Sequence, residues 1–157
     1  MRSSIKAVLY HNTPVGLLRL CADEAGVCGV YFVRQATAEL YPESALLQRT
    51  ARELDEYFAG QRQTFDLPLS LHGTPFQMRV WAALQQIPYG ETRSYAQVAV
   101  MAGNPKSCRA VGMANHRNPV SILVPCHRVI NADGGLGGYG GGLEAKQFLL
   151  TLEKGCR

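Results

Sequence analysis

The sequence lacks the features that would place the chain in a membrane or among disulfide-stabilised secreted proteins. No apolar run approaches the roughly 18–20 residues of a membrane-spanning helix, and Met1–Ser4 does not open a signal peptide. The five cysteines are odd in number, scattered and without a CxxC pair, which argues against a disulfide framework and a cysteine-rich zinc site. We therefore expect the protein to work in a reducing interior.

Positive charge is unevenly distributed along the chain. Of a net charge of +4, residues 1–70 carry seven Lys/Arg against eight Asp/Glu, and residues 71–157 carry nine against four. The basic second half is compatible with a polyanionic partner such as nucleic acid. It is equally compatible with a solvated surface of modest excess charge, so the charge permits DNA binding without demonstrating it.

The first third of the chain predicts strands. Runs rich in β-forming residues at 5–10, 16–21 and 27–33 are separated by the turn sequences Asn12-Thr13-Pro14 and Asp23–Gly26. The short turns between consecutive runs favour antiparallel pairing.

A helix and a connector follow these strands. The helix is expected to end at Gly60, because apolar residues recur at helical spacing at Leu46, Leu47, Ala51, Leu54 and Phe58. Residues 61–72 look like a connector. We therefore expect an α/β (α+β) protein with a small N-terminal lobe over 1–70 and a mostly helical domain over 71–157.

Two capping boxes mark helix starts in the second half. Thr74-Pro75-Phe76-Gln77 has proline at the first helical position, and Ser94-Tyr95-Ala96-Gln97 begins a short helix that stops at Gly103. With a third helix over 107–115, this pair matches a helix-turn-helix. Such pairs are also common packing units that bind no DNA. The second helix of the pair could approach a DNA groove closely, because three of its residues are small: Ala110, Gly112 and Ala114.

The most informative segment is Pro125-Cys126-His127-Arg128-Val129, which follows the apolar run Ile122–Val124. That run predicts a buried strand or a tight turn. A cysteine beside a histidine is a candidate activated nucleophile, because a base raises the thiolate fraction of a thiol whose free pKa is about 8.5. Adjacent side chains point apart, so direct contact between Cys126 and His127 would need a bent backbone. A buried structural cysteine is the alternative.

Glycine is concentrated in residues 134–142, where seven of nine positions are glycine. Such a segment is either a flexible loop or a place where bare backbone meets a ligand. A last helix is expected over 143–154, packing through Phe148, Leu149 and Leu152. Glu153 lies in its final turn, where it is either a solvated glutamate or a carboxylate that orients a histidine.

Together these segments resemble the O6-alkylguanine-DNA alkyltransferases, also called methylated-DNA–protein-cysteine methyltransferases. The resemblance runs from about Gly73 to Glu153, and the N-terminal third fits the family's small αβ lobe. It rests on an ordered set of motifs: Phe76-Gln77, Val80-Trp81, Ile87–Thr92, Ser94-Tyr95, Arg109–Gly112, Asn118-Pro119, Pro125–Val129 and Gly138–Leu143. It implies irreversible transfer of an alkyl group from O6-alkylguanine in DNA to a cysteine, and it leaves O4-alkylthymine open as a second lesion.

The resemblance also implies catalytic roles. Cys126 would be the alkyl acceptor, with His127 as its base through a bridging water and Glu153 holding the imidazole. Tyr95 would donate to guanine N3 as charge develops on the departing base. Because the product is a thioether, which water does not cleave as it cleaves a thioester, each molecule would act once.

Further roles concern the base and the DNA. Backbone groups of Cys126 and Val129 would read the extruded base, with the Gly140 amide facing O6, Tyr139 as a wall and Asn118 bracing the turn. Many family members carry serine at position 140; glycine keeps the backbone contact and would loosen the pocket. The expected DNA-binding residues are Ser94, Arg109, Ala110 and Gly112, with Arg109 filling the gap left by the flipped nucleotide in double-stranded DNA bound through its minor groove.

The resemblance implies a protein of the cytoplasm, or of the nucleus in a eukaryotic source, with no cofactor, no membrane and no obligate protein partner. We expect no metal, because Cys21 and Cys28 lack obvious partner ligands and only His11 is nearby in the sequence. Two alternatives stay open. One is a non-catalytic relative that binds alkylated DNA, which the presence of Cys126 opposes. The other is a cysteine hydrolase built on Cys126, His127 and Glu153, which would turn over and ignore DNA.

Overall fold

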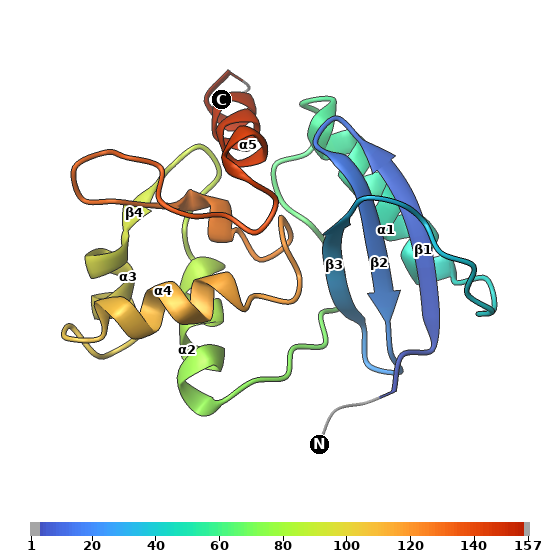
Figure 1. Cartoon of the computed structure of the whole chain (residues 1–157), viewed down its shortest axis with the longest axis horizontal. Coiled ribbons are helices and arrows are strands. Elements are labelled where there is room, and N and C mark those ends of the chain that lie inside the picture. Colours follow the sequence, from blue (N-terminus) through green and yellow to red (C-terminus); the bar gives the residue numbers. More distant parts are fainter. Residues whose placement is uncertain (1–3, 156–157) are drawn as a thin grey trace. The chain divides into compact units, whose positions relative to one another are not determined.

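The structure is a computed structural model that describes residues 4–155; the first three residues and the last two, Cys156 among them, lie outside the described part. The chain divides into two compact units, one ending at His72 and the other starting at Gly73. The first contains a three-stranded sheet and one helix, and the second is mostly helical (Figure 1). This is the α/β class that the sequence predicts.

The first unit is built on an antiparallel sheet of β1 (Ala7–Thr13), β2 (Gly16–Ala22) and β3 (Val27–Val33), in that order. The first strand ends later than expected, because Asn12 and Thr13 pair with β2 and leave only two residues for the turn. Gly16, at φ +111°, supplies the conformation that so short a turn requires.

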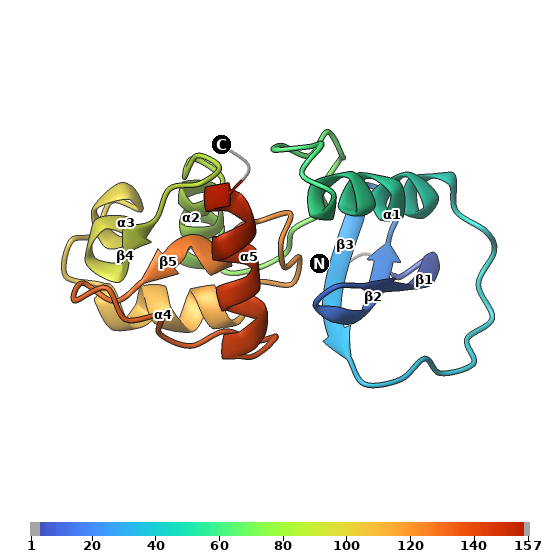
Figure 2. The ribbon, with the colours of Figure 1, turned by 90° about the horizontal axis from the view of Figure 1, so that it is seen from above.

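Helix α1 (Ala45–Phe58) packs along β1 and β2 on one face of the sheet (Figure 2). Ser44 caps its start by accepting a hydrogen bond from the Leu47 amide. The expected buried position Phe58 is only half-buried, and its neighbour Tyr57 is fully buried instead. The reason lies in the connector, because Phe65 packs its ring 5.4 Å from that of Tyr57.

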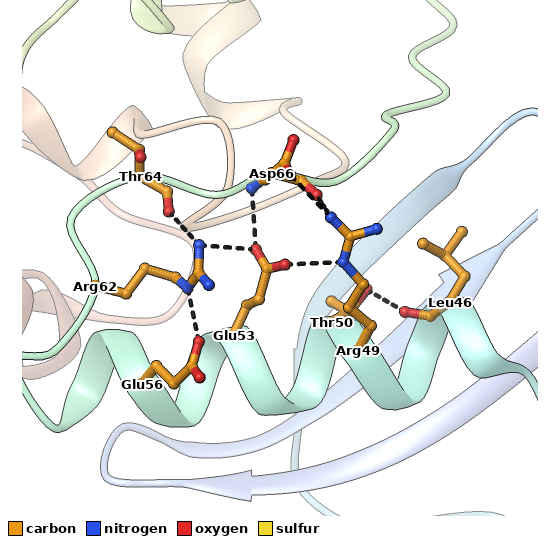
Figure 3. A network of polar contacts seen from close by, with 8 residues as sticks. All are labelled: Leu46, Arg49, Thr50, Glu53, Glu56, Arg62, Thr64 and Asp66. Carbon is orange, nitrogen blue, oxygen red and sulfur yellow. Dashed lines mark hydrogen bonds and ion pairs between the residues drawn. The ribbon is translucent and has the colours of Figure 1, made fainter.

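A buried carboxylate ties the connector to α1 (Figure 3). Glu53, only 3% exposed, accepts hydrogen bonds from Arg49 Nε at 3.0 Å and from the Asp66 amide at 3.0 Å. Arg62 lies 3.4 Å from the same carboxylate and also donates to Glu56 at 2.8 Å. A buried charge needs such compensation, so this network fixes the segment that follows α1.

Three helices of the second unit pack against one another: α2 (Pro75–Leu84), α3 (Tyr95–Met101) and α4 (Cys108–His116). Both predicted capping boxes are present, with Thr74 capping α2 and Ser94 capping α3. Trp81 is buried and donates from Nε1 to the Ala114 carbonyl at 2.9 Å, which joins α2 to α4. Helices α3 and α4 are the predicted helix-turn-helix.

A short parallel pair of strands, β4 (Arg93–Ser94) and β5 (Val129–Ile130), has no signal in the sequence. It places the start of α3 beside the 3-10 turn Cys126–Arg128, which immediately precedes β5. The preceding apolar run is a tight turn rather than a strand, because Ile122 adopts φ +72°. A buried β-branched residue in this conformation is a strained outlier.

Helix α5 (Leu143–Gly155) packs against the same 3-10 turn. The expectation that Phe148 is buried is wrong: it is 41% exposed, whereas Leu149 and Leu150 are buried. The helix instead turns Lys146 and Glu153, seven residues apart and hence on one face, toward the interior. Within residues 4–155, no helix is long and apolar enough to cross a membrane.

Candidate active site

A cavity of about 190 Å³ lies in the second unit, and Cys126 is part of its wall. Residues from α3, α4, the turn before Cys126 and the glycine-rich loop surround it. They are Tyr95, Gly112, Asn115, His116, Asn118, Ser121, Cys126, Gly138, Tyr139 and Gly140. Six of the residues assigned from the sequence therefore meet at one cavity, although they come from distant parts of the chain.

The turn that carries Cys126 is held by two asparagines. Asn118 donates from Nδ2 to the Val124 carbonyl at 2.8 Å and accepts from the Val120 amide at 3.0 Å. Asn115 donates to the Cys126 carbonyl at 3.3 Å. The 3-10 conformation bends the backbone here, so Cys126 and His127 are not arranged as neighbours on a strand would be.

Cys126 is 4% exposed, and this burial raises the pKa of its thiol. Hydrogen bonds from Asn118 and Ser121 and the positive charge of Lys146 oppose the rise without cancelling it. The thiol is consequently protonated at neutral pH. A thiolate nucleophile at this position requires a base.

His127 and Glu153 form a fully buried pair. His127 Nε2 lies 2.7 Å from Glu153 Oε2. Burial lowers the pKa of His127, and the contact with Glu153 only partly restores it. Although burial acts to raise the pKa of Glu153, the hydrogen bonds from His127 and Arg128 bring it below its ordinary value. The pair at neutral pH is a carboxylate and a neutral imidazole.

The carboxylate sets the tautomer of His127. A carboxylate only accepts hydrogen bonds, so Nε2 carries the proton and Nδ1 carries a lone pair. Nδ1 is buried and has no hydrogen-bond partner within the described residues. The arrangement therefore presents a basic nitrogen able to take a proton from a water or a thiol.

Tyr95, the first residue of α3, is half-buried at the cavity. Burial, together with the negative charge that Cys126 can carry, raises the pKa of its phenol, which remains a hydrogen-bond donor at neutral pH. The glycine-rich loop passes close to it: a Cβ at Gly137, which has φ +71°, would lie 2.9 Å from the Tyr95 hydroxyl. Gly112 faces the Tyr95 ring from α4: a Cβ built on Gly112 would lie 4.0 Å from a ring carbon of Tyr95.

The other predicted base-binding residues differ in their position relative to the cavity: Tyr139 and Gly140 line it, and Val129 does not. Tyr139 packs edge-on to His127 with ring centroids 6.5 Å apart. Gly140 has no atom within 4 Å of a Cβ built on it, so a serine there would meet no obstacle. Val129 is buried on β5 and is not among the residues that line the cavity.

The predicted DNA-binding residues lie on the helix-turn-helix. Arg109 and Ala110 are exposed in the first turn of α4, and Arg109 has no side-chain partner among residues 4–155. Ser94 caps α3 by accepting a hydrogen bond from the Gln97 amide at 3.1 Å, so its position already has a structural reason. No group of three or more metal-ligating side chains occurs within the described range.

Comparison with known proteins gives the family. Residues 6–71 match the family model described as "6-O-methylguanine DNA methyltransferase, ribonuclease-like domain", and residues 75–155 match the corresponding "DNA binding domain". The chain belongs to the O6-alkylguanine-DNA alkyltransferase family. The two matches together span nearly all of the described residues.

Individual relatives agree with this assignment. The chain is 48% identical to the methylated-DNA–protein-cysteine methyltransferase of Methanosarcina acetivorans over 150 residues, covering 92% of this chain and 96% of the relative. It is 45% identical to the constitutive Bacillus subtilis protein of the same name, covering 91% and 92%. A crystal structure of Mycobacterium tuberculosis OGT in complex with DNA has a TM-score of 0.86 at 44% identity, covering 94% and 92%.

Among the residues of this alkyltransferase site that the sequence analysis missed are two buried cations, Arg128 and Lys146. Arg128 is buried, donates to both oxygens of Glu153 at 2.8 and 3.0 Å, and donates to the Ile87 carbonyl at 2.7 Å. Its presence in the Pro125–Val129 motif was the only available signal. Lys146 is fully buried, and nothing in the local sequence distinguishes it from the exposed lysine of the same helix, Lys154.

Lys146 joins two walls of the site. Its ammonium donates to the Val129 carbonyl at 2.6 Å, to the Gly138 carbonyl at 3.2 Å and to the Leu136 carbonyl. It thereby fastens the glycine-rich loop to the strand that follows Cys126. Burial lowers the pKa of Lys146 to about 8, so the ammonium is still mostly charged at neutral pH.

We expect Lys146→Met to loosen the glycine-rich loop, because methionine keeps the length of the side chain and removes all three donors. Leaving buried carbonyls unpaired should lower the free energy of unfolding by about 1–3 kcal/mol, measured by urea denaturation. Alkyl transfer should slow for duplex and free-base substrates alike. Lys154→Met, at an exposed site on the same helix, is the matched control, and equal behaviour of the two variants would contradict the role assigned to Lys146.

Proposed function

We propose that this protein repairs DNA by transferring an alkyl group from O6 of a guanine to Sγ of Cys126, once per molecule. The observation that carries the proposal is the buried His127–Glu153 pair, whose histidine is the next residue after Cys126, and Cys126 lies in the wall of a cavity. Relatives that are 45–48% identical over nearly their whole length are named methylated-DNA–protein-cysteine methyltransferases, which supports the same reaction here.

The first step is loss of the thiol proton. Because burial keeps Cys126 protonated and His127 neutral, the proton passes from Sγ through a water to Nδ1 of His127. The imidazolium that forms is stabilised by the Glu153 carboxylate on Nε2. A bridging water answers the geometric difficulty of two adjacent side chains that do not face each other.

The second step is displacement at the alkyl carbon. The Cys126 thiolate forms the S–C bond while the C–O6 bond breaks, and guanine departs with the electron pair of that bond. Tyr95 donates its phenolic proton in a hydrogen bond to N3, where it stabilises the negative charge that develops on the base. The product is S-alkylcysteine, a thioether without a hydrolytic route back to the thiol, which makes the reaction stoichiometric.

The substrate must leave the double helix before it can react. O6 of a stacked guanine lies on the base edge in the major groove, whereas Cys126 is 4% exposed in the wall of a cavity, so the thiol reaches O6 only if the nucleotide is flipped out. We place α4 in the minor groove, with Arg109 inserted where the base was. The complex of the Mycobacterium tuberculosis relative with DNA supports DNA as the partner, and we infer that the protein works where its DNA is: the cytoplasm, or the nucleus in a eukaryotic source.

The decisive experiment removes the acceptor. Cys126→Ala should abolish transfer of a radiolabelled methyl group from duplex DNA to protein, while lesion binding persists because the helix-turn-helix is unchanged. Peptide mass mapping of the reacted wild type should find the alkyl group on Cys126 alone. Cys28→Ala, in the first unit, serves as control; stoichiometric transfer by Cys126→Ala would refute the assignment, and repeated turnover of one molecule would favour a hydrolase.

The His127–Glu153 pair predicts a specific pH dependence. Neutral His127 is the active form and its pKa lies below the ordinary value, so the single-turnover rate should fall only as the pH drops below about 6.5. Glu153→Gln removes the contribution that raises this pKa. The acid limb should then move to still lower pH, and the plateau rate should drop by about 10- to 100-fold.

Glu144→Gln, at an exposed position in the first turn of the same helix, is the control for this variant. A purely structural role of Glu153 would lower the rate without displacing the acid limb. An unchanged limb in Glu153→Gln would therefore return Glu153 to the role of a packing residue.

Arg109 can be separated from the chemistry by changing the substrate. Arg109→Ala should slow repair of duplex DNA by at least about tenfold, because no side chain then fills the gap that the flipped nucleotide leaves in the base stack. The rate with free O6-benzylguanine should stay near that of the wild type. Arg109→Lys keeps the charge and loses the planar group, so it distinguishes stacking from phosphate attraction. Equal slowing of both substrates by Arg109→Ala would remove Arg109 from the flipping step.

A further inference from the structure

The solvent-facing side of α4 carries a methionine between two arginines. Arg109 lies in the first turn of the helix, Met113 follows four residues later, and Arg117 caps the C-terminal end four residues after that. All three are exposed, and Met113 is exposed to 61% although it is a large apolar side chain. A single exposed apolar residue is ordinary on a protein surface, so its position on the helix has to decide whether it has a role.

Helical geometry places Met113 on the side of α4 that Arg109 occupies. Residues four apart are separated by about 40° around a helix axis and by about 6 Å along it. Met113 therefore lies between Arg109 and Arg117, both around the helix and along it. If Arg109 fills a gap in a base stack, the same approach brings Met113 against the duplex.

The dimensions of the minor groove determine what a long apolar side chain can do there. The groove of B-DNA is about 6 Å wide, whereas a helix with its side chains is about 10–12 Å across, so a helix enters only where the groove is opened. A thioether is at best a weak hydrogen-bond acceptor, so Met113 gains little from base edges or phosphates. Minor-groove proteins insert apolar side chains, methionine among them, between base steps and thereby open the groove.

We propose that Met113 enters the minor groove as an apolar wedge and partly unstacks a base step close to the gap that Arg109 fills. The inference rests on the proposed function and adds a second residue that opens the duplex. The spacing fits this role, because about 6 Å between the two positions corresponds to one or two base steps of about 3.4 Å. Arg117, beyond Met113 on the same side, then faces backbone phosphates. Met113 thus contributes a part of the duplex affinity that does not depend on salt.

The first test separates the apolar contact from ionic contacts by their salt dependence. Binding of a duplex with one O6-methylguanine is measured between about 50 and 200 mM salt, in a Cys126→Ala background so that the complex does not react. Met113→Ala should weaken binding about tenfold at every salt concentration, because an apolar contact is lost, and should leave the salt slope unchanged. Arg117→Ala should reduce that slope by about one. Met113→Leu keeps the apolar bulk and should bind nearly as the parent protein does.

The second test detects the unstacked step directly. The adenine analogue 2-aminopurine, whose fluorescence rises when it is unstacked, is placed one or two nucleotides from the lesion on either side. Saturating parent protein should raise the fluorescence at one of these positions, and Met113→Ala should remove most of that rise. Met78→Ala, which truncates an exposed methionine of α2, is the matched control and should behave as the parent protein in both tests.

Three results would overturn the inference: equal binding by the parent protein and Met113→Ala, a fluorescence rise that persists in Met113→Ala, or a loss of affinity that appears only at low salt. With Cys126 present, Met113→Ala should react with free O6-benzylguanine at the wild-type rate, because a free base needs no opened duplex; slowing there would assign Met113 to the fold and overturn the inference as well. Failure of the wild type to accept an alkyl group from any substrate would instead overturn the proposed function.

Discussion

The site depends on keeping one carboxylate charged inside the protein. Glu153 is 1% exposed and receives hydrogen bonds from His127, from Arg128 and from the amide of Gly90. A buried carboxylate is tolerated only with such compensation, so two segments far apart in the sequence, one with Gly90 and one with His127 and Arg128, must converge on the end of α5. The same requirement turns Lys146 and Glu153 inward and leaves Phe148 at the surface, against the hydrophobic pattern of the helix.

The predictable parts of this fold are the local ones. The capping boxes at Thr74 and Ser94 formed as expected, because each depends on residues only three positions apart. The β4–β5 pair and the hydrogen bonds of Lys146 depend on contacts between distant segments, and no periodic pattern in the sequence indicates either of them. The prediction of a buried Phe148 failed for a related reason. The hydrophobic residues were taken to mark the buried face of α5, whereas the buried charged residues Lys146 and Glu153 lie on that face.

The same contrast between local motifs and contacts of distant segments holds for the candidate site. A cysteine next to a histidine was visible in the sequence, but the identity of its carboxylate came from a resemblance, since Glu153 is 26 residues away from His127. The resemblance supplied roles that local patterns cannot. It gave no role to Asn115, which the structure shows donating to the Cys126 carbonyl.

Burial explains both the dormancy of the nucleophile and its selectivity. A thiol that can react only once must not be alkylated by a stray electrophile, and the raised pKa of Cys126 keeps it in the unreactive form. The base that would activate it is itself neutral and shielded beside Glu153. In the mechanism proposed above, the proton passes through a water between the two, in the cavity that the flipped base would also enter. On that proposal reactivity is linked to occupancy of the pocket, and the groups that would seat the base, such as Tyr95 and the loop held by Lys146, influence the chemistry without touching the thiol.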